Sequence, residues 1–209
     1  MAATLAAPGE RIIRKNVPWE EYERLLSEHD PGRGIRIAYD EGTLEIMVLS
    51  LPHEEPNRIL ASLVEIIAEE TGRDFRQIGS TTIKRKDLLK GFEPDSCYYI
   101  TSISKVEGKR LIDFAKDPGP DLVIEVDISQ DSMNKFPLFA AAGIGEVWRH
   151  SNGRVRIYRL REGRYVEQAA SEELPPVTAA RLTEFLELAF KMKRIAWLKH
   201  VRAWVRGNR

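Results

Sequence analysis

Two acidic residues interrupt an otherwise apolar run at residues 122–128, which reads LVIEVDI. The run is typical of a central strand buried on both faces, where a carboxylate is rare unless it is paired with a cation or holds a metal. A period of two places Glu125 and Asp127 on one face of this strand, together with Asp121. We therefore expect the chemistry of the protein to lie beside Glu125.

Two other segments carry residues that could complete a site with Glu125. Asp95 follows a proline at the entrance of an expected strand over 97–100, and Lys135 begins an expected helix over 135–142. Carboxylates on neighbouring strands can hold a hard cation such as Mg²⁺, which lowers the pKa of a bound water. A lysine can neutralise the charge that develops during phosphodiester hydrolysis. Acid pairs at strand ends are common, so spacing alone does not establish this chemistry.

The start of another helix offers further candidates. The segment 53–72 carries an amphipathic apolar stripe, and His53, Glu54 and Glu55 stand in its first turn. Acids at this position complement the helix dipole, which is an ordinary structural explanation for them. The alternative is that one of the two acids, or His53, reaches the site at Glu125.

The other expected elements must position these residues. A helix over 18–29 precedes a hairpin over 35–49, whose charged residues Arg36, Asp40 and Glu45 are expected to face water. Further strands are expected over 75–87, 144–150, 154–161 and 163–171.

The chain reads as one domain over residues 1–190 with a basic helical tail over 191–209. The tail is rich in Lys and Arg, has no acid, and includes Trp197 and Trp204. A basic helix with interleaved tryptophans could bind phosphates, a membrane surface or a partner. The alternative is a C-terminal helix that docks on the domain through its apolar stripe.

Composition and motifs restrict the function classes. The formal net charge is zero, so any nucleic-acid site must come from a local basic patch. The single cysteine, Cys97, excludes an internal disulfide and a Cys-based zinc site, and it fits a reducing compartment. The sequence has no apolar run long enough for a membrane span, and its N-terminus lacks the pattern of a secretory signal, so we expect a cytoplasmic protein. Nucleotide-binding glycine loops and the G-x-S-x-G nucleophile motif are absent.

Several long motifs resemble the Uma-two (Uma2) family of restriction endonuclease-like proteins, within the PD-(D/E)XK nuclease superfamily. The resemblance spans residues 17–186, leaves the tail outside, and rests on motifs in the order of the family. They are PWEEYERLL, GTLEIM, the HE at 53–54, the GSTT at 79–82, GFEPDSCYYI, PGPDLVIEVDIS, the Lys135 helix with AAGIGEVWR, and RVRIYRL.

The resemblance implies an α/β (α+β) fold with a restriction-endonuclease-like core. In this core a mixed β-sheet is flanked by helices, with an N-terminal helix and hairpin and a C-terminal helical tail. The resemblance also implies a divalent metal, Mg²⁺ or alternatively Mn²⁺, with DNA as the substrate.

The resemblance assigns the site residue by residue. The superfamily's two metal-binding acids fall on Asp95 and Glu125, and its helix-borne acid corresponds to Glu54. The superfamily's catalytic lysine would stand at Asp127, and Lys135 on the following helix is the candidate replacement. Asp127 shares a strand face with Glu125 and could be a further metal ligand, in which case it needs positive charge nearby.

Three hypotheses follow for the function. The first is a Mg²⁺-dependent DNA endonuclease, for which a homodimer would suit cleavage of both strands. The second is a catalytically inactive protein that keeps the fold and binds nucleic acid or another partner, because the usual lysine is missing. The third is that Glu125 and Asp127 are satisfied by Arg or Lys inside a core that holds no site.

Overall fold

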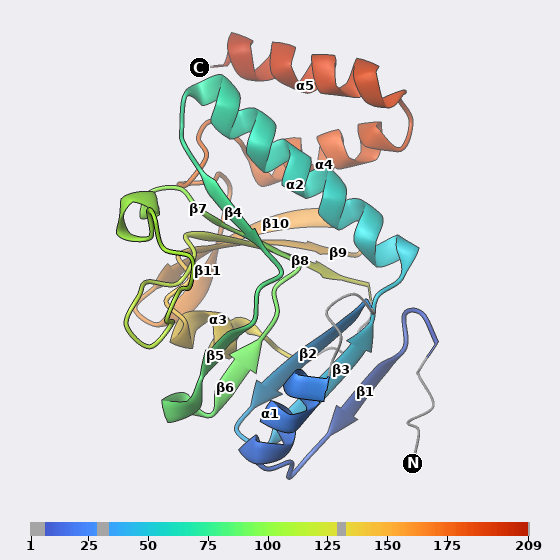
Figure 1. Cartoon of the computed structure of the whole chain (residues 1–209). Coiled ribbons are helices and arrows are strands. Elements are labelled where there is room, and N and C mark those ends of the chain that lie inside the picture. The colour runs from blue at the N-terminus through green and yellow to red at the C-terminus, as the bar shows by residue number, and fades with distance from the viewer. Residues whose placement is uncertain (1–6, 29–33, 129–132, 209) are drawn as a thin grey trace.

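The computed structural model describes residues 7–28, 34–128 and 133–208, and its centre is a mixed six-stranded sheet (Figure 1). The strand order is β11-β10-β9-β8-β7-β4, with β8 and β9 parallel and the other neighbours antiparallel. This confirms the expected mixed sheet, with β8 as an interior strand. The strands are β4 (Arg76–Gly79), β7 (Ser96–Tyr99), β8 (Leu122–Asp127), β9 (Glu146–Ser151), β10 (Arg154–Arg161) and β11 (Arg164–Gln168).

A second, five-stranded sheet packs beside the first, and all its neighbouring strands are antiparallel. It contains the expected hairpin and the N-terminal strand. The single strand expected over 75–87 is wrong: Gly79 turns the chain with a φ of 65°, so β4 and β5 lie in different sheets. The second sheet comprises β1 (Arg11–Arg14), β2 (Ile35–Asp40), β3 (Thr43–Val48), β5 (Ile83–Arg85) and β6 (Lys90–Phe92).

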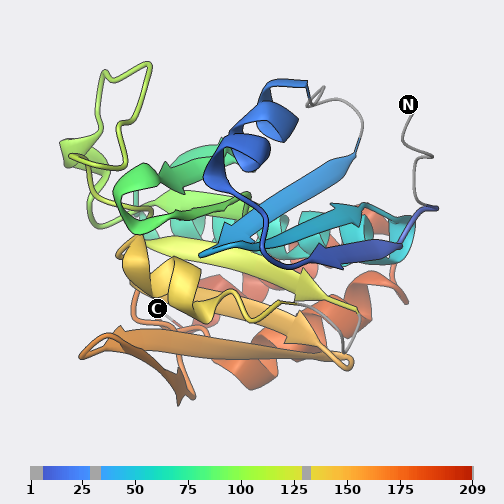
Figure 2. The same ribbon diagram turned by 90° about the horizontal axis from the view of Figure 1, so that it is seen from below.

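Helices cover both faces of the six-stranded sheet (Figures 1 and 2). On one face, Leu122 and Ile124 pack into a core shared with three helices, α2 (Leu51–Thr71), α4 (Ala179–Ala189) and α5 (Arg194–Gly207). On the other face, Val123 and Val147 pack against the short helix α3 (Phe136–Ala141) and residues of the second sheet. Helix α1 (Trp19–Glu28) covers the outer face of the second sheet. The described residues also form two single helical turns, η2 (Lys86–Leu88) and η3 (Ile103–Lys105).

Two-sided coverage explains the apolar character of β8, all six of whose residues are buried. Even-numbered residues face α2, and odd-numbered residues, Glu125 and Asp127 among them, face α3 and the second sheet. The two acids are therefore placed where the second sheet and α3 meet β8.

The C-terminal helix is docked through its apolar stripe, which is one of the two alternatives that its sequence left open. Trp197, Val201 and Val205 are fully buried in the core beside α2. Arg206 and Arg202 pair with Glu70 at the end of α2, at 2.7 and 3.2 Å. None of the described helices is long and apolar enough to cross a membrane.

The Glu70 pairs predict a defined pH dependence of stability. Hydrogen bonds from Arg206, with a further one from Arg202, lower the pKa of Glu70 to about 2. The ion pairs that lower this pKa stabilise the fold fully above the ordinary carboxyl pKa of about 4.3. Their contribution is lost as the pH falls from there towards 2. In urea titrations, the stability difference between the wild type and Glu70→Gln should be constant above about pH 5 and should shrink below it.

The matched control is Glu187→Gln, because Glu187 is exposed on α4 and pairs at 3.8 Å with Lys191, which follows this helix. This variant should follow the wild type throughout the titration, since exposed pairs contribute little. Equal pH dependence of the wild type and Glu70→Gln would show that Glu70 does not hold α5 in place.

Candidate active site

The structure brings Glu125 and Lys135 into direct contact. Glu125 points from β8 towards the start of α3, and Lys135 immediately precedes that helix. The Lys135 ammonium donates a hydrogen bond to Oε1 of Glu125, and both side chains are nearly fully buried. The two residues stand ten positions apart in the sequence, and the lysine covers the acid.

Asp95 lies beside Glu125 on the neighbouring strand. It stands at the entrance of β7, whose residue Ser96 pairs with Ile124 in the antiparallel register. Oδ2 of Asp95 accepts a hydrogen bond from the backbone N–H of Val126 at 2.7 Å, which fixes the carboxylate against β8. The Asp95 side chain is completely buried, and its charge acts on that of Glu125.

His53, not Glu54, is the residue of α2 whose charged group approaches the Asp95 carboxylate. Nε2 of His53 lies 3.2 Å from Oδ2 of Asp95, and the imidazole is 1% exposed. Glu54 lies one step further out, with its Oε1 3.6 Å from Nδ1 of His53. The sequence singled out the first turn of α2, and the helix brings its histidine rather than its acid to Asp95.

The charges of the site shift several pKa values. Burial raises the pKa of Glu125 to about 7, and Asp95 adds to the rise while Lys135 opposes it. Burial also raises the pKa of Asp95, but His53 and Lys135 outweigh it and hold this pKa below its ordinary value. Burial lowers the pKa of Lys135, and the surrounding carboxylates, Glu125 first, raise it above the usual value. Burial likewise lowers the pKa of His53, and Asp95 raises it above normal.

The two central carboxylates each have an oxygen without a donor. Among the described residues, neither Oδ1 of Asp95 nor Oε2 of Glu125 has a hydrogen-bond partner. Buried polar atoms are almost always satisfied, so these two oxygens are suited to receive a cation or a water. A cavity of about 20 Å³ beside Glu125, Asp127 and Lys135 can hold one water-sized group.

Carboxylates of the site could hold a hard cation such as Mg²⁺. No three His, Cys, Asp or Glu side chains within residues 7–28, 34–128 and 133–208 are grouped closely enough to hold a metal ion. Mg²⁺ commonly takes one or two carboxylates from the protein and completes its shell with water and substrate phosphate. Asp95 and Glu125 can supply those two carboxylates.

Asp127 lies between two arginines. Its Oδ2 accepts a hydrogen bond from Nη2 of Arg149 at 2.6 Å, and its Oδ1 lies 3.9 Å from Nη1 of Arg11. The positive charge that an acid beside Glu125 requires is therefore present on the protein itself. Its role as a third metal ligand stays a prediction, and the structure gives Asp127 a different set of partners.

Glu45 belongs to the site although it was expected to face water, and that expectation is wrong. Its side chain is buried, accepts a hydrogen bond from the N–H of Met133 at 2.8 Å, and lies 3.6 Å from Arg11 and 4.0 Å from Lys135. The reason is that β3 is covered on both faces. The signal in the sequence was Met47, which lies on the same face two residues on and is also buried.

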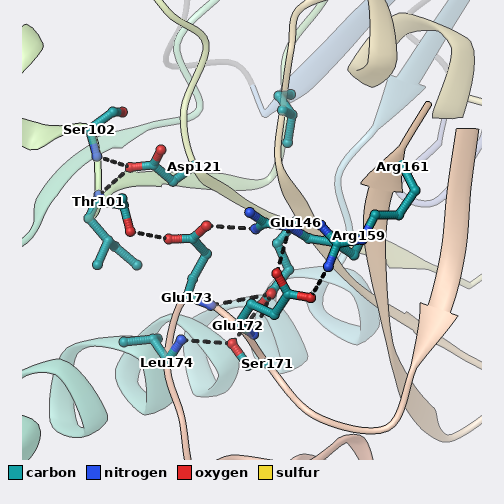
Figure 3. Close-up of polar contacts among 12 residues, drawn as sticks. Thr101, Ser102, Asp121, Glu146, Arg159, Arg161, Ser171, Glu172, Glu173 and Leu174 are labelled. Carbon is teal, nitrogen blue, oxygen red and sulfur yellow. Dashed lines mark hydrogen bonds and ion pairs between the residues drawn. The ribbon is translucent and has the colours of Figure 1, made fainter. Parts of the chain in front are cut away.

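A second cluster of acids, with Glu146 buried and Asp121 half-buried, has only structural hydrogen bonds among the described residues (Figure 3). Asp121 accepts hydrogen bonds from the N–H groups of Ile100 and Ser102, at 2.7 and 2.8 Å. Both carboxylate oxygens of Glu146 accept hydrogen bonds, from Ser171 Oγ at 2.6 Å and from the N–H of Glu172 at 2.8 Å among others. Asp95 and Glu125 differ from these acids because each keeps one buried oxygen without a donor.

Comparisons with known proteins identify a matching family, and one of the matching solved structures is described below. The family described as "Putative restriction endonuclease", Uma2, matches residues 19–192. The crystal structure of "a putative nuclease belonging to DUF820" from Anabaena variabilis ATCC 29413 is 16% identical, with a TM-score of 0.48. The match covers 90% of this chain and 99% of that one. A search of the curated proteins found no match.

Proposed function

Because the chain belongs to the Uma2 family, which supports a nuclease function, we propose that it is a Mg²⁺-dependent endonuclease that hydrolyses phosphodiester bonds in DNA. The observation that carries the proposal is the pair of buried carboxylates, Asp95 and Glu125, each with one oxygen that no described donor satisfies. Mn²⁺ is the alternative cation, because it also takes carboxylate and water ligands.

Each residue of the site has a role in this proposal. Asp95 and Glu125 hold the metal, which when bound polarises a phosphoryl oxygen and lowers the pKa of a water. Lys135 stands against Glu125 and can stabilise negative charge that develops on the substrate. His53 fixes the orientation of Asp95 from α2, and Glu54 supports His53 from outside.

The direct test is cleavage of DNA by the purified protein. Single-stranded, linear duplex and supercoiled DNA are incubated with Mg²⁺, with Mn²⁺ and with EDTA. The proposal expects products with either cation and none with EDTA. Loss of supercoiled substrate to nicked circles would show that internal bonds are cut, whereas cleavage that continues in EDTA would exclude a metal-dependent site.

Metal binding without DNA gives a second expected outcome. In calorimetric titrations, the wild type should bind Mn²⁺, and Asp95→Asn should bind at least about tenfold more weakly, because the amide cannot supply a charged ligand. Asp113→Asn is the control, since Asp113 is an exposed acid that pairs with Lys116 at 3.0 Å. Equal affinity of Asp95→Asn and the wild type would remove Asp95 from the site, and no binding by the wild type would favour buried ion pairs without a metal.

A second candidate function has a specific observation in its favour. Glu125 and Asp127 are already paired with Lys135 and Arg149, so their charges are balanced without a metal. This arrangement fits a protein that keeps the fold and binds DNA or another partner without cleaving it. DNA affinity without products in any of the cleavage reactions would support this candidate.

The docked C-terminal helix limits how DNA binding can be tested. Deletion of residues 191–209 would remove Trp197, Val201 and Val205 from the core, so loss of affinity in that variant would reflect unfolding. Point substitutions of exposed tail residues such as Lys199 avoid this problem. A homodimer and a cytoplasmic location stay predictions from the sequence.

A further inference from the structure

Arg149 stands directly across from Glu125. In the parallel pairing of β8 and β9, Glu125 and Arg149 are partners, so their side chains project from the same face of the sheet. Both residues line the cavity of about 20 Å³ that Asp127 and Lys135 also border. The guanidinium is therefore a neighbour of the proposed metal-binding carboxylate.

Two contacts hold the Arg149 side chain in place. Asp127 accepts a hydrogen bond from its Nη2 at 2.6 Å, and the guanidinium carbon lies 5.7 Å from the centre of the Phe136 ring. A guanidinium has five N–H donors, and Asp127 is the one side-chain acceptor that the described residues offer it. Within the described part of the chain, its other donors have no acceptor and can face a ligand.

Arg149 is also the most accessible of three cations at the site. Lys135 and Arg11 have side chains that are 6% and 9% exposed, and both are enclosed among carboxylates. The Arg149 side chain is 35% exposed, although its partner Asp127 is 8% exposed. Of the three, Arg149 is the one that DNA can reach without a change in the fold.

We propose that Arg149 binds a non-bridging oxygen of a DNA phosphate next to Glu125, and that Asp127 positions Arg149 for this contact. The proposal rests on the proposed function, because it takes DNA as the ligand of this site. A guanidinium matches the geometry of a phosphate and keeps its charge at any working pH. Asp127 is then a positioning residue for the arginine.

The test distinguishes two roles for Arg149, which are contact with a DNA phosphate and neutralisation of the Asp127 charge alone. The variants are Arg149→Gln, Arg149→Lys, Asp127→Ala, Asp127→Asn and the double variant Asp127→Asn/Arg149→Gln. The double variant removes both charges together, so it does not leave Asp127 buried without Arg149. Thermal unfolding of each variant identifies any loss of affinity that comes from unfolding.

DNA affinity is measured in EDTA over a range of salt concentrations, so that cleavage does not interfere. Arg149→Gln and the double variant should both bind about tenfold to a hundredfold more weakly than the wild type. The slope of log affinity against log salt should fall by about 0.9 for duplex DNA, as expected when one phosphate contact is lost. Arg149→Lys should keep the slope but bind with intermediate affinity, because it keeps the charge and loses the planar geometry.

The role of Asp127 is read from its coupling to Arg149. Asp127→Ala should weaken binding about tenfold, whereas Asp127→Asn should bind nearly as well as the wild type because the amide oxygen can still accept the hydrogen bond. The double variant should bind no more weakly than Arg149→Gln alone, because Asp127 acts through Arg149. Wild-type affinity and salt slope in the double variant would overturn the phosphate contact, as would failure of the wild type to bind DNA.

Cleavage assays with Mg²⁺ distinguish failure of the Arg149 phosphate contact from failure of the proposed nuclease function. If the wild type cleaves DNA while the Arg149 variants retain full affinity and activity, the phosphate contact is wrong and the nuclease stands. If DNA affinity depends on Arg149 but no condition yields products, the nuclease is wrong and the phosphate contact stands.

Discussion

Glu125→Gln is expected to lower Mg²⁺-dependent cleavage of DNA by about a thousandfold. The amide keeps the shape of the side chain and can still accept the hydrogen bond from Lys135, but it cannot supply a charged metal ligand. The measurement is the initial rate of product formation at saturating Mg²⁺, together with a titration of the metal. We expect both a lower maximum rate and a higher Mg²⁺ requirement.

The matched control for this variant is Glu45→Gln. Glu45 also lies against Lys135, at 4.0 Å, so its replacement removes a carboxylate from the same lysine without removing a proposed metal ligand. Its effect on the rate should be smaller by at least about tenfold. Wild-type cleavage by Glu125→Gln would place the catalytic metal elsewhere or attribute the activity to a contaminating nuclease.

The parts of the fold that depend on local sequence could be predicted well. The apolar run identified β8 as a buried central strand, and the turn residues around Glu41 and Gly42 identified the β2–β3 hairpin. Asp95, Glu125 and Lys135 are also predicted to share one site, but spacing alone is weak evidence for it and the assignment rests on the family resemblance.

The rest of the site depends on packing between elements that are distant in the sequence. Glu45 and Arg11 come from the second sheet, and nothing in their local patterns shows that this sheet covers the β8 face. His53 is one of several polar residues in the first turn of α2, and only the angle of the helix decides that it meets Asp95. Arg149 requires the parallel register of β8 and β9 to be known.

Asp127 shows that the charges around a site residue also depend on packing between distant elements. Its strand face follows from period two and is observed as predicted, but the face alone does not reveal which charges stand around it. Arg149 and Arg11 supply positive charge from β9 and β1, so this acid has cationic partners within the protein itself. The position for which the sequence resemblance implied a lysine thus holds an acid, and its partner Arg149 borders the cavity.

The two candidate functions differ in the role of Lys135, which either serves a metal site or only forms a buried ion pair. The Lys135→Met variant should behave differently in the two cases. Loss of the lysine leaves Glu125 and Glu45 buried without this cation, which should lower the free energy of unfolding by about 3–5 kcal/mol in EDTA. A metal site should recover part of this loss on addition of Mn²⁺, because the ion replaces the missing charge. Cleavage should fall by about a hundredfold to a thousandfold if Lys135 stabilises charge on the substrate.

Lys90→Met is the control for Lys135→Met, since Lys90 pairs with Asp40 and Glu41 in the second sheet, away from the proposed metal. Its side chain is 16% exposed, so its replacement should cost less stability, and added Mn²⁺ should stabilise it no more than the wild type. If Mn²⁺ also fails to stabilise Lys135→Met, the lysine and Glu125 form a structural ion pair. A larger Mn²⁺ stabilisation of Lys135→Met than of the wild type would instead mean that lysine and metal compete for the same carboxylate. The contact between Lys135 and Glu125 would then be the metal-free state of a working site.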